Sequence, residues 1–133
     1  MRAFNGRAPY NRGYAFETRA RQALEALGWH VERRHKSAFP DLTCLPVLDR
    51  TDAELAQIPD WRLEKLGAAH QALGSTPLFV ECKVGGKLSK QERERFVPLM
   101  RHARCLMAYP EKLRGKVTVV FADAQTGVEV FRT

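Results

Sequence analysis

The chain has 133 residues, of which 44% are hydrophobic and 28% are charged, a composition typical of a single globular domain. Lysine and arginine outnumber aspartate and glutamate by 22 to 15, which gives a formal net charge of +7 and an isoelectric point near 9.7. This basic balance favours a polyanionic partner, nucleic acid first and an anionic membrane surface second.

Neither a membrane-spanning nor a secreted protein is expected. No apolar run approaches the roughly 20 residues that a membrane span needs. The polar residues 1–12 also lack the apolar segment of a secretory signal. Three widely spaced cysteines, with no Cys-x-x-Cys pair, favour reduced thiols and argue against a zinc site. We therefore expect a cytoplasmic protein.

The N-terminal part predicts a basic arm followed by a helix. Residues 1–12 carry three arginines, including Arg12, and form either a flexible arm that binds a partner or a terminus without a role. In residues 13–27 apolar side chains recur at helical spacing, and Gly28 marks the end of the helix. Glu17 lies at the edge of this apolar stripe, so it faces either a groove or solvent.

Two strands and a basic connection are expected next. Residues 29–33 alternate between apolar and polar side chains, which indicates a strand. The basic connection after it is either a solvated loop or a grip on backbone phosphates, with Arg33, Arg34, Lys36 and Ser37 as candidates. Asp41 then opens a second strand over residues 41–45, directly after Pro40.

Residues 46–77 read as a helical insertion rather than as part of the sheet. Thr51 and Glu54 have the spacing of a capping box. Asp60 is placed to cap a second helix that ends at Gly74. This hairpin is inert, a dimer contact or a flap over the substrate.

The central strand is expected over residues 78–84, an apolar stretch interrupted by two charges. Because side chains alternate along a strand, Glu81 and Lys83 share one face and Cys82 lies on the other, as part of the core. An isolated Glu-x-Lys is most often a structural ion pair. Charges inside a sheet nevertheless need a partner or a metal, because burying an uncompensated charge is costly.

The remainder completes an α/β fold with a mixed central sheet flanked by helices. A basic turn at Lys87 leads to a second capping box, Ser89 to Glu92, which opens a helix that runs to about His102 with a kink at Pro98. Three more strands are expected over residues 105–109, 117–121 and 128–131. We expect residues 1–133 to form one domain.

Acidic residues from distant parts of the chain suit metal-dependent phosphodiester chemistry. If the strands of Asp41 and Glu81 are neighbours, their carboxylates meet and can hold Mg²⁺, which needs only one or two carboxylates besides water and phosphate. The backbone carbonyl of Cys82 is a plausible further ligand. Glu17 would complete the metal shell or act as a base, and Lys83 would hold the attacking water or offset charge.

These motifs, taken together and in order, resemble the PD-(D/E)xK nuclease superfamily, whose fold is restriction-endonuclease-like. Within it, the archaeal-type Holliday junction resolvases are the closest match. The matching segments are Gly13-Tyr14-Ala15-Phe16-Glu17, Gly28-Trp29, Ser37, Phe39-Pro40-Asp41, Glu81-Cys82-Lys83 and the helix with Gln91. The resemblance covers nearly the whole chain except residues 46–77, where the family has a tight turn.

The resemblance implies a Mg²⁺-dependent, homodimeric endonuclease that resolves four-way DNA junctions by paired symmetric cuts, with Mn²⁺ as a substitute metal. It implies catalytic roles for Glu17, Asp41, Glu81 and Lys83. The expected DNA contacts are Arg12, Arg33, Arg34, Lys36, Ser37, Lys87 and Gln91. Such an enzyme would act at the nucleoid, or in a host cytoplasm if it is virus-encoded. The alternatives are a repair or restriction-like nuclease of the same superfamily, a non-catalytic DNA-binding module, and a structural protein with ordinary ion pairs.

Overall fold

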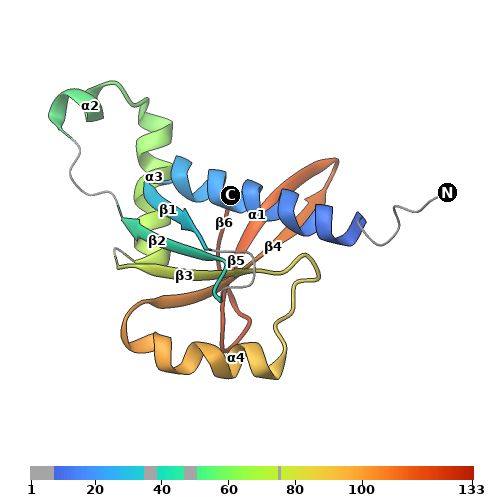
Figure 1. The fold of residues 1–133 in the computed structure, drawn as a ribbon. Helices are drawn as coiled ribbons and strands as arrows, with labels where there is room; N and C mark the ends of the chain where they lie inside the picture. Colours follow the sequence, from blue (N-terminus) through green and yellow to red (C-terminus); the bar gives the residue numbers. More distant parts are fainter. Residues whose placement is uncertain (1–7, 35–38, 47–50, 75) are drawn as a thin grey trace.

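The protein is an α/β structure with a six-stranded mixed sheet flanked by helices (Figure 1). This computed structural model describes residues 8–34, 39–46, 51–74 and 76–133, and side chains from residue 13 onward within them. The elements are α1 (Ala8–Ala26), β1 (Trp29–Arg33), β2 (Leu42–Pro46), α2 (Asp52–Ala56), α3 (Asp60–Leu73), β3 (Leu78–Cys82), α4 (Lys90–Phe96), the 3₁₀ helix η1 (Val97–Arg101), β4 (Arg104–Leu113), β5 (Lys116–Asp123) and β6 (Glu129–Arg132).

The strands follow one another across the sheet in chain order, β1 to β6. All neighbouring pairs are antiparallel except β3 and β4, which run parallel. A parallel pair needs a crossover, and α4 with η1 supplies it. The expected pairing of the strands that carry Asp41 and Glu81 is confirmed, since β2 and β3 are antiparallel neighbours.

Helices cover both faces of the sheet, α1 on one and α4 on the other (Figure 1). Under α1 lies the larger apolar cluster, which includes Leu24, Leu78 and Val80. Under α4 lies a smaller cluster around Phe96 and Met107. Successive residues of β3 therefore serve opposite faces, as strand alternation requires.

The first helix begins earlier than its sequence pattern predicted. Residues 8–12 were expected to belong to a flexible arm, but α1 starts at Ala8. Pro9 is compatible with this start, because residues of the first helical turn have no partner for an amide hydrogen. The remainder of the arm, residues 1–7, lies outside the described residues.

The helical insertion has the expected helices, and its second helix joins the core. The Thr51–Glu54 capping box is present, whereas Pro59 rather than Asp60 occupies the N-cap of α3. Ala69 and Leu73 of α3 are fully buried against the α1 cluster. The ring of His70 stacks on Trp29 with 4.0 Å between centroids. α3 is therefore part of the core, whereas α2 has no buried residue, and the three roles considered for the insertion stay predictions.

The capping box at Ser89 and Glu92 opens α4 as predicted. The helix changes to 3₁₀ geometry at Val97, next to Pro98, which cannot donate the hydrogen bond of a continuing α-helix. None of the described helices combines the length and the apolar character needed to cross a bilayer.

Candidate active site

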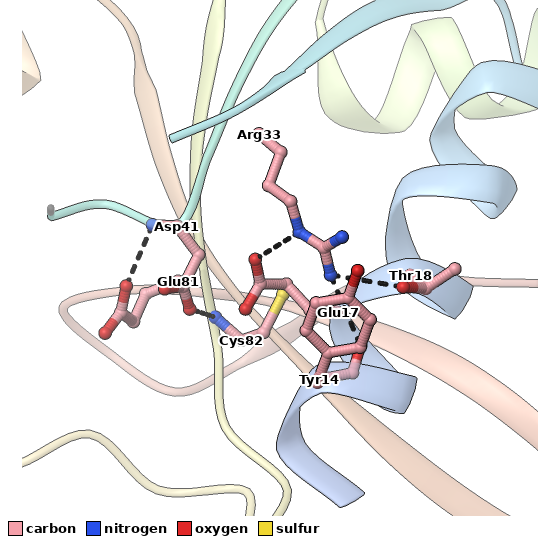
Figure 2. A network of polar contacts seen from close by, with 7 residues as sticks. All are labelled: Tyr14, Glu17, Thr18, Arg33, Asp41, Glu81 and Cys82. Atoms are coloured by element: carbon pink, nitrogen blue, oxygen red, sulfur yellow. Dashed lines mark hydrogen bonds and ion pairs between the residues drawn. The ribbon is translucent and has the colours of Figure 1, made fainter. Parts of the chain in front are cut away.

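Asp41 and Glu81 are interlocked at one end of the β2–β3 pair. The Asp41 backbone N–H donates to Glu81 Oε1 at 3.0 Å, and the Cys82 N–H donates to Asp41 Oδ2 at 2.9 Å (Figure 2). Asp41 comes just before β2, and Glu81 is the next-to-last residue of β3. Because the two strands are antiparallel, the start of β2 and the end of β3 lie at the same end of the strand pair.

The environment of this carboxyl pair disfavours two negative charges. Burial raises the pKa of both groups, because neither keeps its full hydration shell. The charge of Asp41 adds to this effect on Glu81, and together they raise the pKa of Glu81 to about 8. A hydrogen bond between the two carboxyl groups lowers the pKa of Asp41 and raises that of Glu81. Without a bound cation, the fold therefore favours the protonated form of Glu81 near neutral pH.

A pocket of about 490 Å³ opens next to the pair, and its wall reaches across to α1. Its lining residues are Gly13, Tyr14, Glu17, Arg33, Arg34, Asp41, Glu81 and Cys82. Three acidic residues from remote segments thus share one concave, partly basic surface. An open pocket with convergent polar groups and perturbed pKa values is the usual form of a functional site.

Glu17 faces this pocket, which is one of the two alternatives that the helix pattern left open, but Arg33 binds it. Arg33 Nε donates to Glu17 Oε1 at 2.8 Å, and both side chains are 22% exposed. The same guanidinium contacts Thr18 Oγ1 at 3.1 Å and lies 4.1 Å from the ring centroid of Tyr14 (Figure 2). Arg33 is the last residue of β1, as the alternation over residues 29–33 predicted. This arrangement fixes the Glu17 carboxylate and supplies positive charge to the pocket.

Cys82 lies between the acidic residues, with its side chain on the α1 side of the sheet. It packs partly against the α1 cluster, as the strand alternation predicted. It also lines the pocket, which the sequence pattern did not indicate. Burial raises the pKa of this thiol, so it stays protonated and uncharged at neutral pH.

Lys83 lies one residue beyond β3 and points to α4. Its Nζ contacts Glu92 Oε2 at 2.6 Å. Glu92 also accepts the Ser89 N–H at 2.8 Å, so one carboxylate both caps α4 and holds the lysine. Burial works against the charged form of Glu92, but the hydrogen bonds from Lys83 and Ser89, together with the charge of Lys83, outweigh it, so the pKa of Glu92 is lowered. The positive charge of Lys83 also lowers the pKa of Asp41, so the amine acts on the carboxyl pair.

The predicted DNA contacts fall into three groups. Arg33 and Arg34 line the pocket, Arg34 with an exposed side chain. Lys87 is exposed on the segment that leads into α4, and Gln91 is exposed in the first turn of α4. Lys36, Ser37 and the side chain of Arg12 lie outside the described residues.

The donor set fits a hard divalent cation. No three His, Cys, Asp or Glu side chains gather into a metal cage within the part of the chain that the structure describes. Mg²⁺, however, does not use such a cage but takes one or two carboxylates together with water and phosphate oxygens. Asp41 and Glu81 are two half-buried carboxyl groups with raised pKa values, whose negative charges a cation would offset. Glu17 is engaged with Arg33, and its role as a further ligand stays a prediction, as does that of the Cys82 carbonyl.

Comparison with known proteins assigns nothing further to this site. The chain matches no protein-family model, no curated protein and no solved structure. The assignment of its chemistry therefore rests on its own residues and on the order of its motifs.

The sequence did not predict three side-chain contacts of the site, which are made by Tyr14, Thr18 and Glu92. Tyr14 precedes Glu17 by three positions, and Thr18 follows Tyr14 by four, so helical spacing places all three on one face of α1. That spacing was a usable signal. The contact of Glu92 with Lys83 had none, because a capping box looks the same whether or not its acid also binds a lysine.

Proposed function

We propose that this protein is a metal-dependent endonuclease that hydrolyses phosphodiester bonds in DNA. The observation that carries the proposal is the interlocked pair of Asp41 and Glu81, drawn from two segments of the chain and half-buried with raised pKa values beside a pocket. A structural ion pair does not explain this arrangement, because the two groups have the same charge and each disfavours ionisation of the other.

The residues divide the chemistry between them. Asp41 and Glu81 would hold the cation, which supplies a Lewis acid for the phosphoryl oxygen and lowers the pKa of a bound water. Lys83, held by Glu92, provides positive charge next to the carboxyl pair, where it can offset charge that develops on the phosphate. Arg34, exposed at the pocket wall, supplies positive charge for a phosphate backbone, whereas the charge of Arg33 is engaged with Glu17.

Junction resolution is the finer proposal, and it rests on the resemblance of the motifs. An enzyme of that kind would act on four-way junctions as a homodimer, with one pocket for each of two opposed cuts. A repair or restriction-like nuclease would have the same pocket and a different substrate. The basic charge of the chain supports a DNA partner for both.

The test is cleavage of a synthetic four-way junction and of a matched linear duplex, with products mapped on all strands. We expect symmetric cuts near the branch point with Mg²⁺ or Mn²⁺, and no cuts with a chelator. Asp41→Asn should lower the cleavage rate at least about 100-fold, whereas the exposed Glu25→Gln on α1 should cleave like wild type.

Each outcome separates the candidates. Cutting of the linear duplex at a rate equal to that of the junction would replace resolution by a general nuclease. Tight DNA binding without any cutting, unaffected by Asp41→Asn, would indicate a non-catalytic DNA-binding module. Cleavage that survives Asp41→Asn would refute the assignment of this pocket.

A further inference from the structure

The hairpin between β4 and β5 extends beyond the strand that carries Glu81. β3 ends beside Ala108 of β4, whereas β4 continues to Leu113 before the chain turns back into β5. Five more residues at about 3.4 Å each carry the tip about 17 Å past the end of β3. Figure 1 shows this two-stranded ribbon leaving the remainder of the sheet. Because β3 and β4 are parallel, it projects from the end of the sheet where the carboxyl pair lies.

The hairpin tip, residues 112–117, carries three exposed cations and no acid: Lys112, Arg114 and Lys116. Among the described residues, none of these cations takes part in an ion pair. The nearest acid in the sequence, Glu111, binds Arg132 Nη1 at 2.7 Å instead. Like charges on a projecting ribbon repel one another, so the fold alone gives no reason for the cluster.

Arg114 occupies a backbone conformation that stability alone would not assign to arginine. Leu113 pairs with Lys116, which leaves Arg114 and Gly115 as a two-residue turn with φ values of 52° and 82°. Two positive φ values define a type I′ turn, for which Asn-Gly is the favoured sequence. A side chain other than glycine or asparagine is strained in this region. A strained arginine at an exposed tip therefore points to a use for its charge.

We propose that the hairpin tip binds the phosphate backbone of duplex DNA on one side of the cleavage site. The inference deepens the proposed function and rests on it for the identity of the nucleic acid. Three exposed cations complement a polyanion, and successive phosphates of one strand lie about 3.4 Å apart along the axis. A reach of about 17 Å therefore spans about five nucleotides. Such contacts fix the position of the duplex and do not read its sequence.

The test measures DNA binding separately from cleavage, with a chelator present and with the salt concentration varied. The variant Lys112→Gln/Arg114→Gln/Lys116→Gln removes three charges from the hairpin tip. The control variant is Arg62→Gln/Lys65→Gln/Arg101→Gln. It also removes three exposed charges, two from α3 and one from the end of η1, which precedes the opposite end of β4. For the hairpin variant we expect the slope of log affinity against log salt to fall by about 2 to 3, because each phosphate contact contributes about 0.9. The control should retain the slope of wild type.

Arg114→Asn separates a binding role from a structural one. Asparagine tolerates a positive φ better than arginine does, so this variant should melt about 2–4 °C higher than wild type. It should nevertheless bind DNA about five- to tenfold more weakly at 0.1 M salt, since one phosphate contact is lost. Higher stability combined with weaker binding cannot arise from damage to the fold.

Equal salt slopes for the hairpin variant and its control would overturn the proposal. So would unchanged DNA affinity together with a loss of self-association, because the hairpin would then contact a second copy of the chain. If the protein binds DNA through the hairpin tip but never cleaves it, the proposed chemistry is refuted and this interface stands. If it cleaves DNA and the hairpin variant binds like wild type, the interface alone is refuted.

Discussion

At the scale of single residues, the stability of this protein depends on pH through carboxyl groups whose pKa values the fold shifts, Glu81 upward and Glu92 downward. The pKa of Glu81 is about 8 in the fold, against an ordinary value of 4.5. The protonated form is thus favoured by folding, so the contribution of Glu81 to stability is complete below about pH 4.5 and is lost as the pH rises to 8. Glu92 acts in the opposite direction, because its pKa is lowered and its contribution is lost in acid.

In metal-free buffer, we expect wild type to lose stability as the pH rises. The variant Glu81→Gln should not show this loss. Between pH 5 and 8, the free energy of unfolding of wild type should fall relative to the variant by about 1–3 kcal/mol, since a tenfold change in proton affinity corresponds to about 1.4 kcal/mol. Urea denaturation at several pH values measures this difference. Parallel pH profiles for the two proteins would show that Glu81 is not perturbed, and Glu25→Gln is the matched control.

Glu92 tests whether the position of Lys83 matters for cleavage. Glu92→Gln can still accept the Ser89 N–H but removes the ion pair with Lys83. We expect its cleavage rate to fall about 10- to 100-fold, with a shifted pH profile, because a misplaced charge no longer faces the phosphate. Ser89→Ala removes the other half of the capping box and should cost about 1 kcal/mol of stability without this loss of rate. Equal rates for the two variants would assign Glu92 a purely structural role.

At the scale of elements, α3 is the helix whose position in the structure differs most from the position that its sequence predicted. Its sequence reads as part of a helical insertion outside the sheet, yet Leu73 and Ala69 are completely buried. His70 Nε2 lies 3.0 Å from the carbonyl oxygen of Leu27, and Arg104 donates to the carbonyl of Ala72 at 2.6 Å. These contacts tie the helix to the segment after α1 and to β4.

Leu73→Ala should therefore destabilise the protein by about 2–5 kcal/mol, as expected for a buried leucine whose cavity cannot collapse. Leu55→Ala in α2, where the side chain is 38% exposed, should change the stability by less than about 1 kcal/mol. Chemical denaturation compares the two. Similar losses from both substitutions would mean that α3 does not belong to the core.

At the scale of the whole molecule, local signals predicted the elements and one non-local contact. Alternation, capping boxes and helix-ending glycines depend on near neighbours in the chain, so Gly28 and Ser89 mark their boundaries correctly. The meeting of Asp41 with Glu81 was predictable too, because adjacent antiparallel strands bring the start of one to the end of the next.

Contacts between side chains on separate elements were not predictable in this way. The approach of Lys83 to Glu92 and of Arg33 to Glu17 depends on side-chain torsions and on how helices pack against the sheet. The packing of His70 on Trp29 has no signal along the chain, since the two residues lie 41 positions apart. The overhang of the β4–β5 hairpin depends on where β3 stops, which periodicity locates only to within a few residues.

The central claim is that Asp41 and Glu81 share one divalent cation, and Mn²⁺ binding tests it most directly. Electron paramagnetic resonance of free Mn²⁺, titrated with the full chain at pH 7.5, gives the number of sites and their affinity. We predict one site that Mg²⁺ displaces, with an affinity at least about tenfold weaker in Asp41→Asn and unchanged in Glu25→Gln. Equal Mn²⁺ affinity in wild type and Asp41→Asn would contradict the account.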